Sequence, residues 1–249
     1  MSIPLEDVAR FLDRRLDVTR YDEPESNELI VRAKDSVSRV AAAVSTTFHA
    51  IEEAKRLGAD LLVVHHRSWP EIDLGLVEEK HRRLAEHGIS LYGAHSALDG
   101  APGISNGDLL ARAVGLTVEQ RFLEYHGGLA GVIANGSGTF DAFLARLRTA
   151  LGARVEGFRN NDRFGRVAIA TGGAPFTTMV EAAAALGADT YLTGEGSMYT
   201  RLYGKERGVN IVFGTHWATE QFGVKGLAEA IEGEFGLPWG FIAEPEDVR

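Results

Sequence analysis

The sequence contains no cysteine among its 249 residues. Disulfide bonds, thiolate metal sites, iron–sulfur clusters and cysteine nucleophiles are therefore excluded. Any metal bound by this chain must be held by histidine and carboxylate ligands, which the eight histidines and 35 acidic residues can supply.

The sequence also lacks a basic excess and a long apolar run. Its 26 basic residues against 35 acidic ones give a formal net charge of −9. A nucleic-acid-binding domain usually carries a basic footprint, so we expect no nucleic-acid partner. No stretch reaches the roughly 20 apolar residues that span a bilayer, so we expect no membrane partner. The hydrophobic fraction of 45% is typical of a globular protein.

The N-terminal segment does not have the uninterrupted apolar core of an export signal. Residues 1–18 are charged throughout and predict an amphipathic helix, with Pro4 near its start. The apolar stripe of this helix has helical spacing and comprises Leu5, Val8, Ala9, Leu12 and Leu16. We therefore expect a cytoplasmic protein.

An internal repeat organises the chain. Strand-like runs at 40–44 and 61–64 flank a helix-like stretch, and strand-like runs at 167–170 and 190–193 do the same in the second half. In both copies Leu-Gly-Ala-Asp precedes the second strand. Such strand–helix–strand units normally form right-handed crossovers in a parallel sheet.

The repeat predicts the fold class and the domain organisation. We expect an α/β protein with two related α/β lobes, covering residues 1–122 and 123–249, in which the C-terminal segment can pack back on the first lobe. Thr178, followed by Glu181 three residues later, predicts a capping box at the start of the helix in the second copy.

Histidine and carboxylate residues follow three of the strand-like runs. An adjacent histidine pair ends the run at 61–64, and a His-x-x-x-carboxylate spacing occurs once in each half. Open α/β sheets bind ligands beyond the carboxyl ends of their strands. We therefore predict a metal site from these segments, which contain His65, His66, His95, Asp99, His216 and Glu220.

The spacing of these residues indicates two metal ions. Adjacent residues on a strand point to opposite faces, so His65 and His66 suit two neighbouring ions better than one. His216 and Glu220 are four residues apart and would share one face of a helix. The carboxylate of Glu220 can bridge two cations. Imidazole and carboxylate ligands suit Zn, Mn, Fe or Co, and leave the metal undetermined.

Four motifs in order resemble the Nif-three-like family of dinuclear-metal-centre proteins, also known as GTP cyclohydrolase I type-two homologues. The motifs are Leu-Leu-Val-Val-His-His at 61–66, Ala-His-Ser-Ala-Leu-Asp-Gly-Ala-Pro-Gly at 94–103, Ala-Asp-Thr-Tyr-Leu-Thr-Gly-Glu at 188–195 and Gly-Thr-His-Trp-Ala-Thr-Glu at 214–220. The resemblance extends from about residue 37 to the C-terminus.

The resemblance implies a Nif-three-like fold with a dinuclear metal site in the cleft between two α/β lobes. It implies a homohexamer, a trimer of dimers, with metal sites facing its interior. The residues that match the family's metal ligands are His65, His66, Asp99, His216 and Glu220, with Glu220 as the bridge. His95 matches a histidine near the site that is not a usual ligand, and we assign it the catalytic role of proton shuttle.

Two functions remain open at this stage. The first is a metal-dependent hydrolase that acts on a small molecule, nucleotide-like or phosphorylated. The second is a non-catalytic metal-binding assembly or regulatory protein. The first predicts turnover by metal-loaded protein, whereas the second predicts metal occupancy without turnover.

Overall fold

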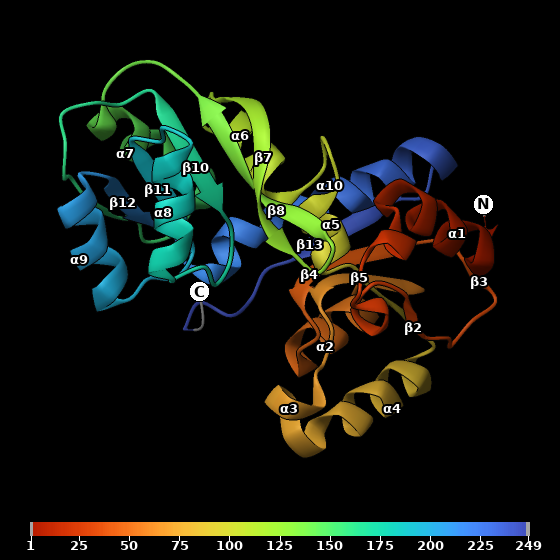
Figure 1. Cartoon of the computed structure of the whole chain (residues 1–249). Coiled ribbons are helices and arrows are strands. Elements are labelled where there is room, and N and C mark those ends of the chain that lie inside the picture. The colour runs from red at the N-terminus through yellow and green to blue at the C-terminus, as the bar shows by residue number, and fades with distance from the viewer. Residues whose placement is uncertain (1, 248–249) are drawn as a thin grey trace. The chain divides into compact units, whose positions relative to one another are not determined.

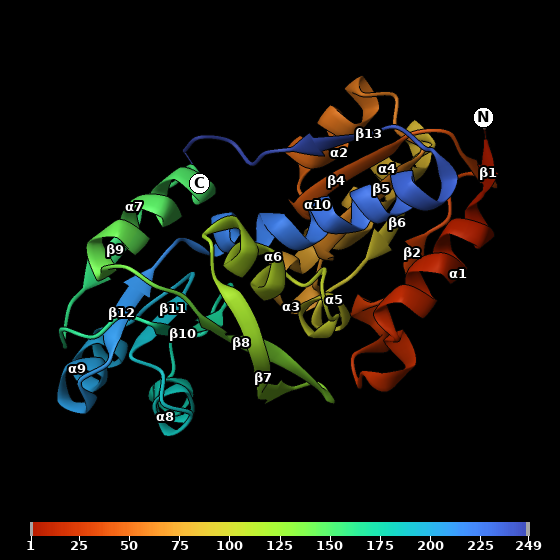
Figure 2. The same cartoon turned by 90° about the horizontal axis from the view of Figure 1, so that it is seen from above.

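The computed structural model describes residues 2–247 and has a mixed α/β architecture. The chain forms two compact units (Figures 1 and 2). The first unit comprises residues 2–104, 126–128 and 223–247, and the second comprises 105–125 and 129–222. The boundary predicted between residues 122 and 123 falls inside strand β7 (Thr117–Tyr125). The first unit is discontinuous in sequence, because residues from 223 onward return to it after the second unit.

The first unit is built on a five-stranded sheet with the order β13-β4-β5-β6-β2. The first four strands are parallel and β2 is antiparallel to β6. The strands are β2 (Leu29–Val31), β4 (Val40–Ser45), β5 (Leu61–His66), β6 (Ser90–Gly93) and β13 (Trp239–Ile242), and a separate antiparallel pair is formed by β1 (Ile3–Pro4) and β3 (Ser36–Val37).

The helices of the first unit cover this sheet. Helices α2 and α4 pack against one face through a core that includes Ile51, Leu84 and Leu62. The predicted apolar stripe of α1 is confirmed, since all five of its members are buried. The helices are α1 (Leu5–Leu16), α2 (Phe48–Arg56), α3 (Pro70–Asp73), α4 (Val77–His87) and α5 (Ser96–Gly100), with short 3₁₀ turns at Val18–Arg20, Pro24–Ser26 and Leu74–Leu76.

The second unit is built on a six-stranded sheet with the order β7-β8-β10-β11-β12-β9. Strands β10, β11 and β12 are parallel, and the flanking strands β8 and β9 are antiparallel to them. Its remaining strands are β8 (Gly128–Asn135), β9 (Glu156–Phe158), β10 (Arg166–Ala170), β11 (Thr190–Thr193) and β12 (Asn210–Phe213).

Helices lie on both faces of this second sheet. Side chains of α6 and α7 share one core with alternate residues of β10, including Val167 and Ile169. Residues of α8 share the opposite core with Ala168 and Ala170. The helices are α6 (Asn106–Ala113), α7 (Phe140–Leu151), α8 (Thr177–Ala185), α9 (Met198–Arg207) and α10 (His216–Phe235), and α10 continues into the first unit.

The strand–helix–strand repeat predicted from the sequence is confirmed. Strands β4 and β5 are parallel and connected through α2, and β10 and β11 are parallel and connected through α8. The predicted capping box at Thr178 is wrong: α8 begins one residue earlier, at Thr177, and its N-cap residue Phe176 has no capping side chain.

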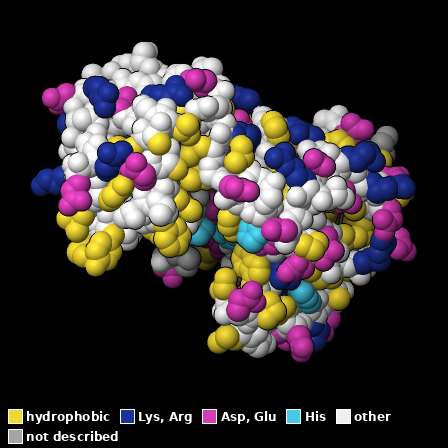
Figure 3. Space-filling view, viewed as in Figure 1, with side chains coloured by type: hydrophobic (Ala, Val, Ile, Leu, Met, Phe, Trp, Pro, Cys, Tyr) yellow, Lys and Arg dark blue, Asp and Glu magenta, His cyan; other side chains and the backbone are white. Residues whose placement is uncertain are grey.

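The surface gives no sign of a basic face in the direction shown in Figure 3, where Lys and Arg side chains are interspersed with Asp and Glu. Across residues 2–247, no helix has the length and apolar character that a membrane crossing requires.

Candidate metal centre

Four of the predicted site residues lie together in the first unit. The ligand atoms of His65, His66 and His95 lie within 4.8 Å of one another. Asp99 joins them, with Oδ2 3.5 Å from Nε2 of His65. His65 and His66 come from the end of β5. His95 directly precedes α5, which contains Asp99 and follows the neighbouring strand β6. The carboxyl ends of two adjacent parallel strands thus deliver all four groups, as the sheet-edge argument predicts.

The two adjacent histidines are anchored to different neighbouring strands. Nδ1 of His65 lies 2.8 Å from the carbonyl oxygen of Ala94, directly after β6. Nδ1 of His66 lies 3.0 Å from Oγ of Ser45, the last residue of β4. His65 is fully buried, whereas His66 is partly exposed. The rings therefore diverge from the common strand while their centroids stay 4.8 Å apart.

His95 is held by residues that the sequence analysis did not select. Its Nδ1 lies 2.8 Å from Oε2 of Glu23, and its backbone N–H donates to Oδ1 of buried Asn27. The same Asn27 oxygen accepts from the N–H of Ala97. Asn27 therefore satisfies two of the N–H groups at the start of α5 and fixes the position of His95.

The charge of His95 also controls Glu23. Burial by itself would raise the pKa of Glu23, but the hydrogen bond and charge of His95, with hydrogen bonds from Ser96 and Ser26, outweigh it and lower that pKa to about 2. Glu23 is therefore ionised at neutral pH and accepts a hydrogen bond from His95. An ionised carboxylate on Nδ1 orients the ring, as carboxylates do for histidines in hydrolase sites.

The other two predicted site residues lie together in the second unit. His216 begins α10 and Glu220 follows one turn later, with 3.2 Å between Nε2 of His216 and Oε2 of Glu220. Nδ1 of His216 lies 2.7 Å from Oε1 of Glu195, which follows β11. Burial by itself would lower the pKa of His216, but the two carboxylates raise it to about 9. This part of the second unit therefore favours a positive charge at His216.

Glycines allow the close approach of chain segments around Glu220. Gly172, with φ +67°, lies so close to Glu220 that a Cβ at this position would be 1.9 Å from Oε1 of Glu220 and 3.1 Å from Nε2 of His216. Gly194 packs against the same turn of α10, since its Cβ would lie 2.8 Å from Cα of His216. Only residues without a side chain leave Glu220 in this position.

The residues in each of the two units fit divalent metal ions. Each of these four histidines has its Nδ1 within hydrogen-bond distance of an oxygen, from Ala94, Ser45, Glu23 or Glu195. The carbonyl of Ala94 and the carboxylates of Glu23 and Glu195 can only accept, so they place the proton on Nδ1 and leave Nε2 available for a metal. The hydroxyl of Ser45 can donate or accept, so its contact orients the ring of His66 without selecting a tautomer. Imidazole nitrogens with the carboxylates of Asp99 and Glu220 are the ligand chemistry of Zn, Mn, Fe and Co.

Comparisons with known proteins agree with the family that the sequence resembles. The model of the Duf34/NIF3 (NGG1p interacting factor 3) family matches residues 3–246. A protein of Deinococcus radiodurans named GTP cyclohydrolase 1 type 2 homolog is 35% identical, covering 98% of this chain and 94% of that protein. A protein of the same name from Archaeoglobus fulgidus is 30% identical, covering 98% and 99% of the two chains.

Solved structures have the same fold. A protein named ybgI, described as of unknown function, superimposes with a TM-score of 0.88 at 25% identity, covering 98% of this chain and 99% of that one. The protein TTHA1606 from Thermus thermophilus superimposes with a TM-score of 0.80 at 28% identity, again covering 98% and 99% of the two chains.

Proposed function

We propose that this chain, which belongs to the Duf34/NIF3 family, is a metal-dependent hydrolase acting on a nucleotide-like or phosphorylated small molecule. Its ligands would be His65, His66, Asp99, His216 and Glu220, which would hold two divalent ions. The observation that supports this proposal best is the hydrogen bonding of His65 and His216 through Nδ1 to oxygens that can only accept, which leaves Nε2 of each for a metal. The relatives' name, GTP cyclohydrolase 1 type 2 homolog, supports the substrate class.

The carboxylates favour cations before any metal binds. Glu195 and Glu220 raise the pKa of His216 to about 9, because both stabilise a positive charge beside them. A divalent cation would gain the same stabilisation once it displaces the proton from Nε2. Bound divalent ions supply Lewis-acid chemistry, polarising a scissile bond and activating water.

His95 would move the proton in the proposed reaction. Its Nε2 accepts a proton while Nδ1 stays hydrogen-bonded to Glu23, 2.8 Å away. The ionised carboxylate of Glu23 stabilises the resulting imidazolium, and the histidine then passes the proton to the leaving group. Trp69 packs against this ring, with its centroid 5.2 Å from that of His95.

Metal content and turnover test the proposal together. Elemental analysis of the purified protein should give about two metal equivalents per chain, and fewer in Glu220→Gln and His65→Ala. The matched control Glu206→Gln, at an exposed position of α9, should keep both. The protein loaded with Mn, Zn or Fe is then assayed against nucleotides and phosphoesters. Two metals without turnover on any of these substrates would favour the non-catalytic alternative, and unchanged metal content in Glu220→Gln would contradict the ligand assignment.

Metal loading should also depend on pH. Imidazole must be neutral at Nε2 to bind a metal, so loading should fall as pH is lowered through the histidine range. Elemental analysis after equilibration at several pH values measures this, and loading that stays constant from pH 8 to 5 would argue against histidine ligands.

A further inference from the structure

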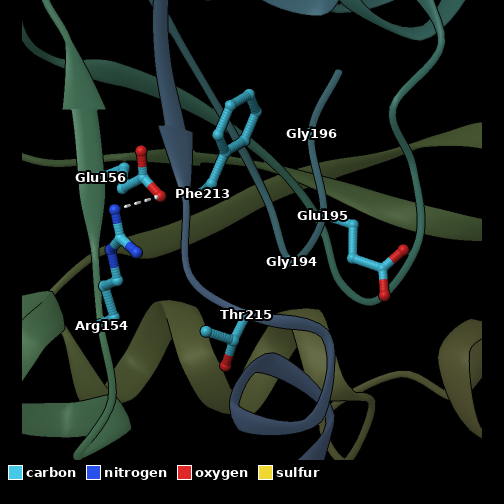
Figure 4. A pocket seen from close by; sticks show the side chains of 7 residues that line it. All are labelled: Arg154, Glu156, Gly194, Glu195, Gly196, Phe213 and Thr215. Carbon is cyan, nitrogen blue, oxygen red and sulfur yellow. Dashed lines mark ion pairs between the residues drawn. The ribbon is translucent and has the colours of Figure 1, made fainter. Parts of the chain in front are cut away.

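A cavity of about 310 Å³ lies within the second unit (Figure 4). Its volume is at the lower end of the range for small-molecule sites, and fits one heterocyclic ring system. It is lined by residues from three chain segments: Arg154, Glu156, Gly194, Glu195, Gly196, Phe213 and Thr215.

The topology of the sheet assembles this cavity. Phe213 of β12 pairs directly with Glu156 of antiparallel β9, and β11 lies on the other side of β12. Residues 194–196 leave the carboxyl end of β11, and Thr215 follows the carboxyl end of β12. Ligands of open α/β sheets bind at such strand ends. Gly196 lets its loop close on the aromatic ring, since a Cβ there would lie 1.9 Å from an atom of Phe213.

The polar groups of the cavity have opposite charges side by side. A guanidinium nitrogen of Arg154 lies 3.2 Å from Oε1 of Glu156, and both side chains are accessible, at 79% and 45% exposure. The contact uses one nitrogen and one oxygen, so the guanidinium has further N–H donors and the carboxylate a second acceptor. Because the charges of Arg154 and Glu156 cancel, this side of the cavity favours a neutral ligand over a free anion. Such a ligand would carry a hydrogen-bond donor next to an acceptor.

A further feature of the lining favours a ligand here. Thr215 has φ +64°, an uncommon and strained conformation for a β-branched residue. Strain of this kind is concentrated at functional sites. The apolar wall is Phe213, whose ring is partly exposed.

We propose that this cavity binds a planar heterocycle through a lactam edge, the N–H and C=O pair of a hydroxypurine or a uracil-type ring. The ring N–H donates to Glu156, the carbonyl accepts from Arg154, and the ring lies along Phe213. The cavity's role as a substrate subsite rests on the proposed function. Glu195 links the two, because it lines the cavity and also holds Nδ1 of His216.

Matched nucleosides test the lactam edge. Inosine has N1–H and a carbonyl where adenosine has an unprotonated nitrogen and an amino group, and the two are otherwise alike. Isothermal titration of the full chain, as purified and after removal of metal by chelation, should give inosine roughly tenfold or more tighter binding than adenosine. Uridine should likewise bind more tightly than cytidine, because uridine has the N–H and C=O pair that cytidine lacks. Equal affinities within both pairs would overturn the lactam assignment, and no binding by any nucleoside would overturn the cavity itself.

Variants locate the binding. Arg154→Ala and Glu156→Ala should each weaken inosine binding about tenfold and remove the preference over adenosine, while Glu206→Ala on α9 should change neither. Unchanged binding in both cavity variants would place the nucleoside elsewhere and overturn the proposal. The measurement needs neither metal nor turnover. Inosine binding at this cavity without any hydrolysis would contradict the proposed function alone. Hydrolysis by a protein whose inosine binding is unchanged in both cavity variants would contradict this inference alone.

Discussion

The chemistry of the candidate centre depends on residues far apart in sequence. Glu23 lies 72 positions before His95 and Asn27 lies 68 before it, yet both hold it. Spacing reveals pairs within a turn or a helix, such as His216 with Glu220, and cannot reveal partners that only tertiary folding brings together. The sequence therefore predicted the histidines of the candidate centre but missed the carboxylates that orient His95 and His216.

Glu23 should contribute stability that depends on pH. Its folded-state pKa of about 2 is depressed from the ordinary 4.5. Its contribution is therefore present above pH ~4.5 and is lost as pH falls toward 2. Glu23→Gln should lower the free energy of unfolding by about 1–3 kcal/mol at pH 7, and by much less near pH 2. Urea unfolding across this pH range measures the difference.

The exposed neighbour Glu25 provides the control for this experiment. It lies 3.9 Å from a guanidinium nitrogen of Arg67, and its side chain is 58% exposed. Glu25→Gln should change stability by less than about 0.5 kcal/mol. Equal effects of the two substitutions at pH 7 would show that the contact between Glu23 and His95 contributes little.

His95→Ala distinguishes a proton shuttle from a metal ligand. A shuttle predicts full metal content and a loss of activity on the order of a hundredfold or more. A ligand predicts the loss of one metal equivalent, measured by elemental analysis. If the variant keeps both its metals and its activity, His95 has only a structural role and the assignment is wrong.

At the scale of elements, the internal repeat is also visible in the contacts of His95 and His216. His95 and His216 each stand at the start of a helix that follows a strand, and each places Nδ1 on a glutamate. The repeated strand–helix–strand pattern was predictable because its hydrophobic runs and Gly turns are local signals. The exact helix starts were not: the predicted box at Thr178 is absent, whereas Ser197 and Thr200 form one at α9. Tertiary packing decides such boundaries.

The loop containing Gly172 should be intolerant of any side chain. Gly172→Ala adds a Cβ where φ is +67° and where Oε1 of Glu220 lies 1.9 Å away. The expected result is a loss of about 2 kcal/mol or more of stability, from backbone strain and displacement of Glu220, together with reduced metal content. Thermal unfolding and elemental analysis of the same sample measure both effects.

Gly152→Ala separates the effect of backbone strain from that of the steric clash with Glu220. Gly152 ends α7 with φ +61°, and no atom lies within 4 Å of the position its Cβ would take. This variant should cost only about 1 kcal/mol and keep its metal. Equal metal loss in both glycine variants would mean that general destabilisation, and not displacement of Glu220, empties the centre.

At the scale of the whole molecule, composition excluded several classes of function. The oligomeric state, in contrast, was predicted only from the family resemblance. The acidic charge and the absence of cysteine are properties of the entire chain and needed no structure. Neither says how copies of the chain associate. The structure adds two groups of exposed large apolar side chains. One is a short segment of the first unit, with Ile72 at 69%, Leu74 at 74% and Leu76 at 48% exposure. The other is on α9 of the second unit, with Met198 at 62%, Tyr199 at 67% and Leu202 at 48%.

We predict that the protein is a homohexamer in solution. Isolated apolar side chains are common on monomers, but three alternate residues in one segment are typical of a surface that another chain covers. Light scattering at micromolar concentration should give about six times the mass of one chain. Leu74→Asp should lower this mass, because a charge buried at an interface without a partner is costly. Leu74 lies on the surface with φ +51°, a conformation that Asp tolerates better than Leu. The variant should therefore fold and retain the far-ultraviolet circular dichroism of the parent. A mass near that of one chain for the parent protein would contradict the hexamer, and an unchanged mass for folded Leu74→Asp would place the interface elsewhere.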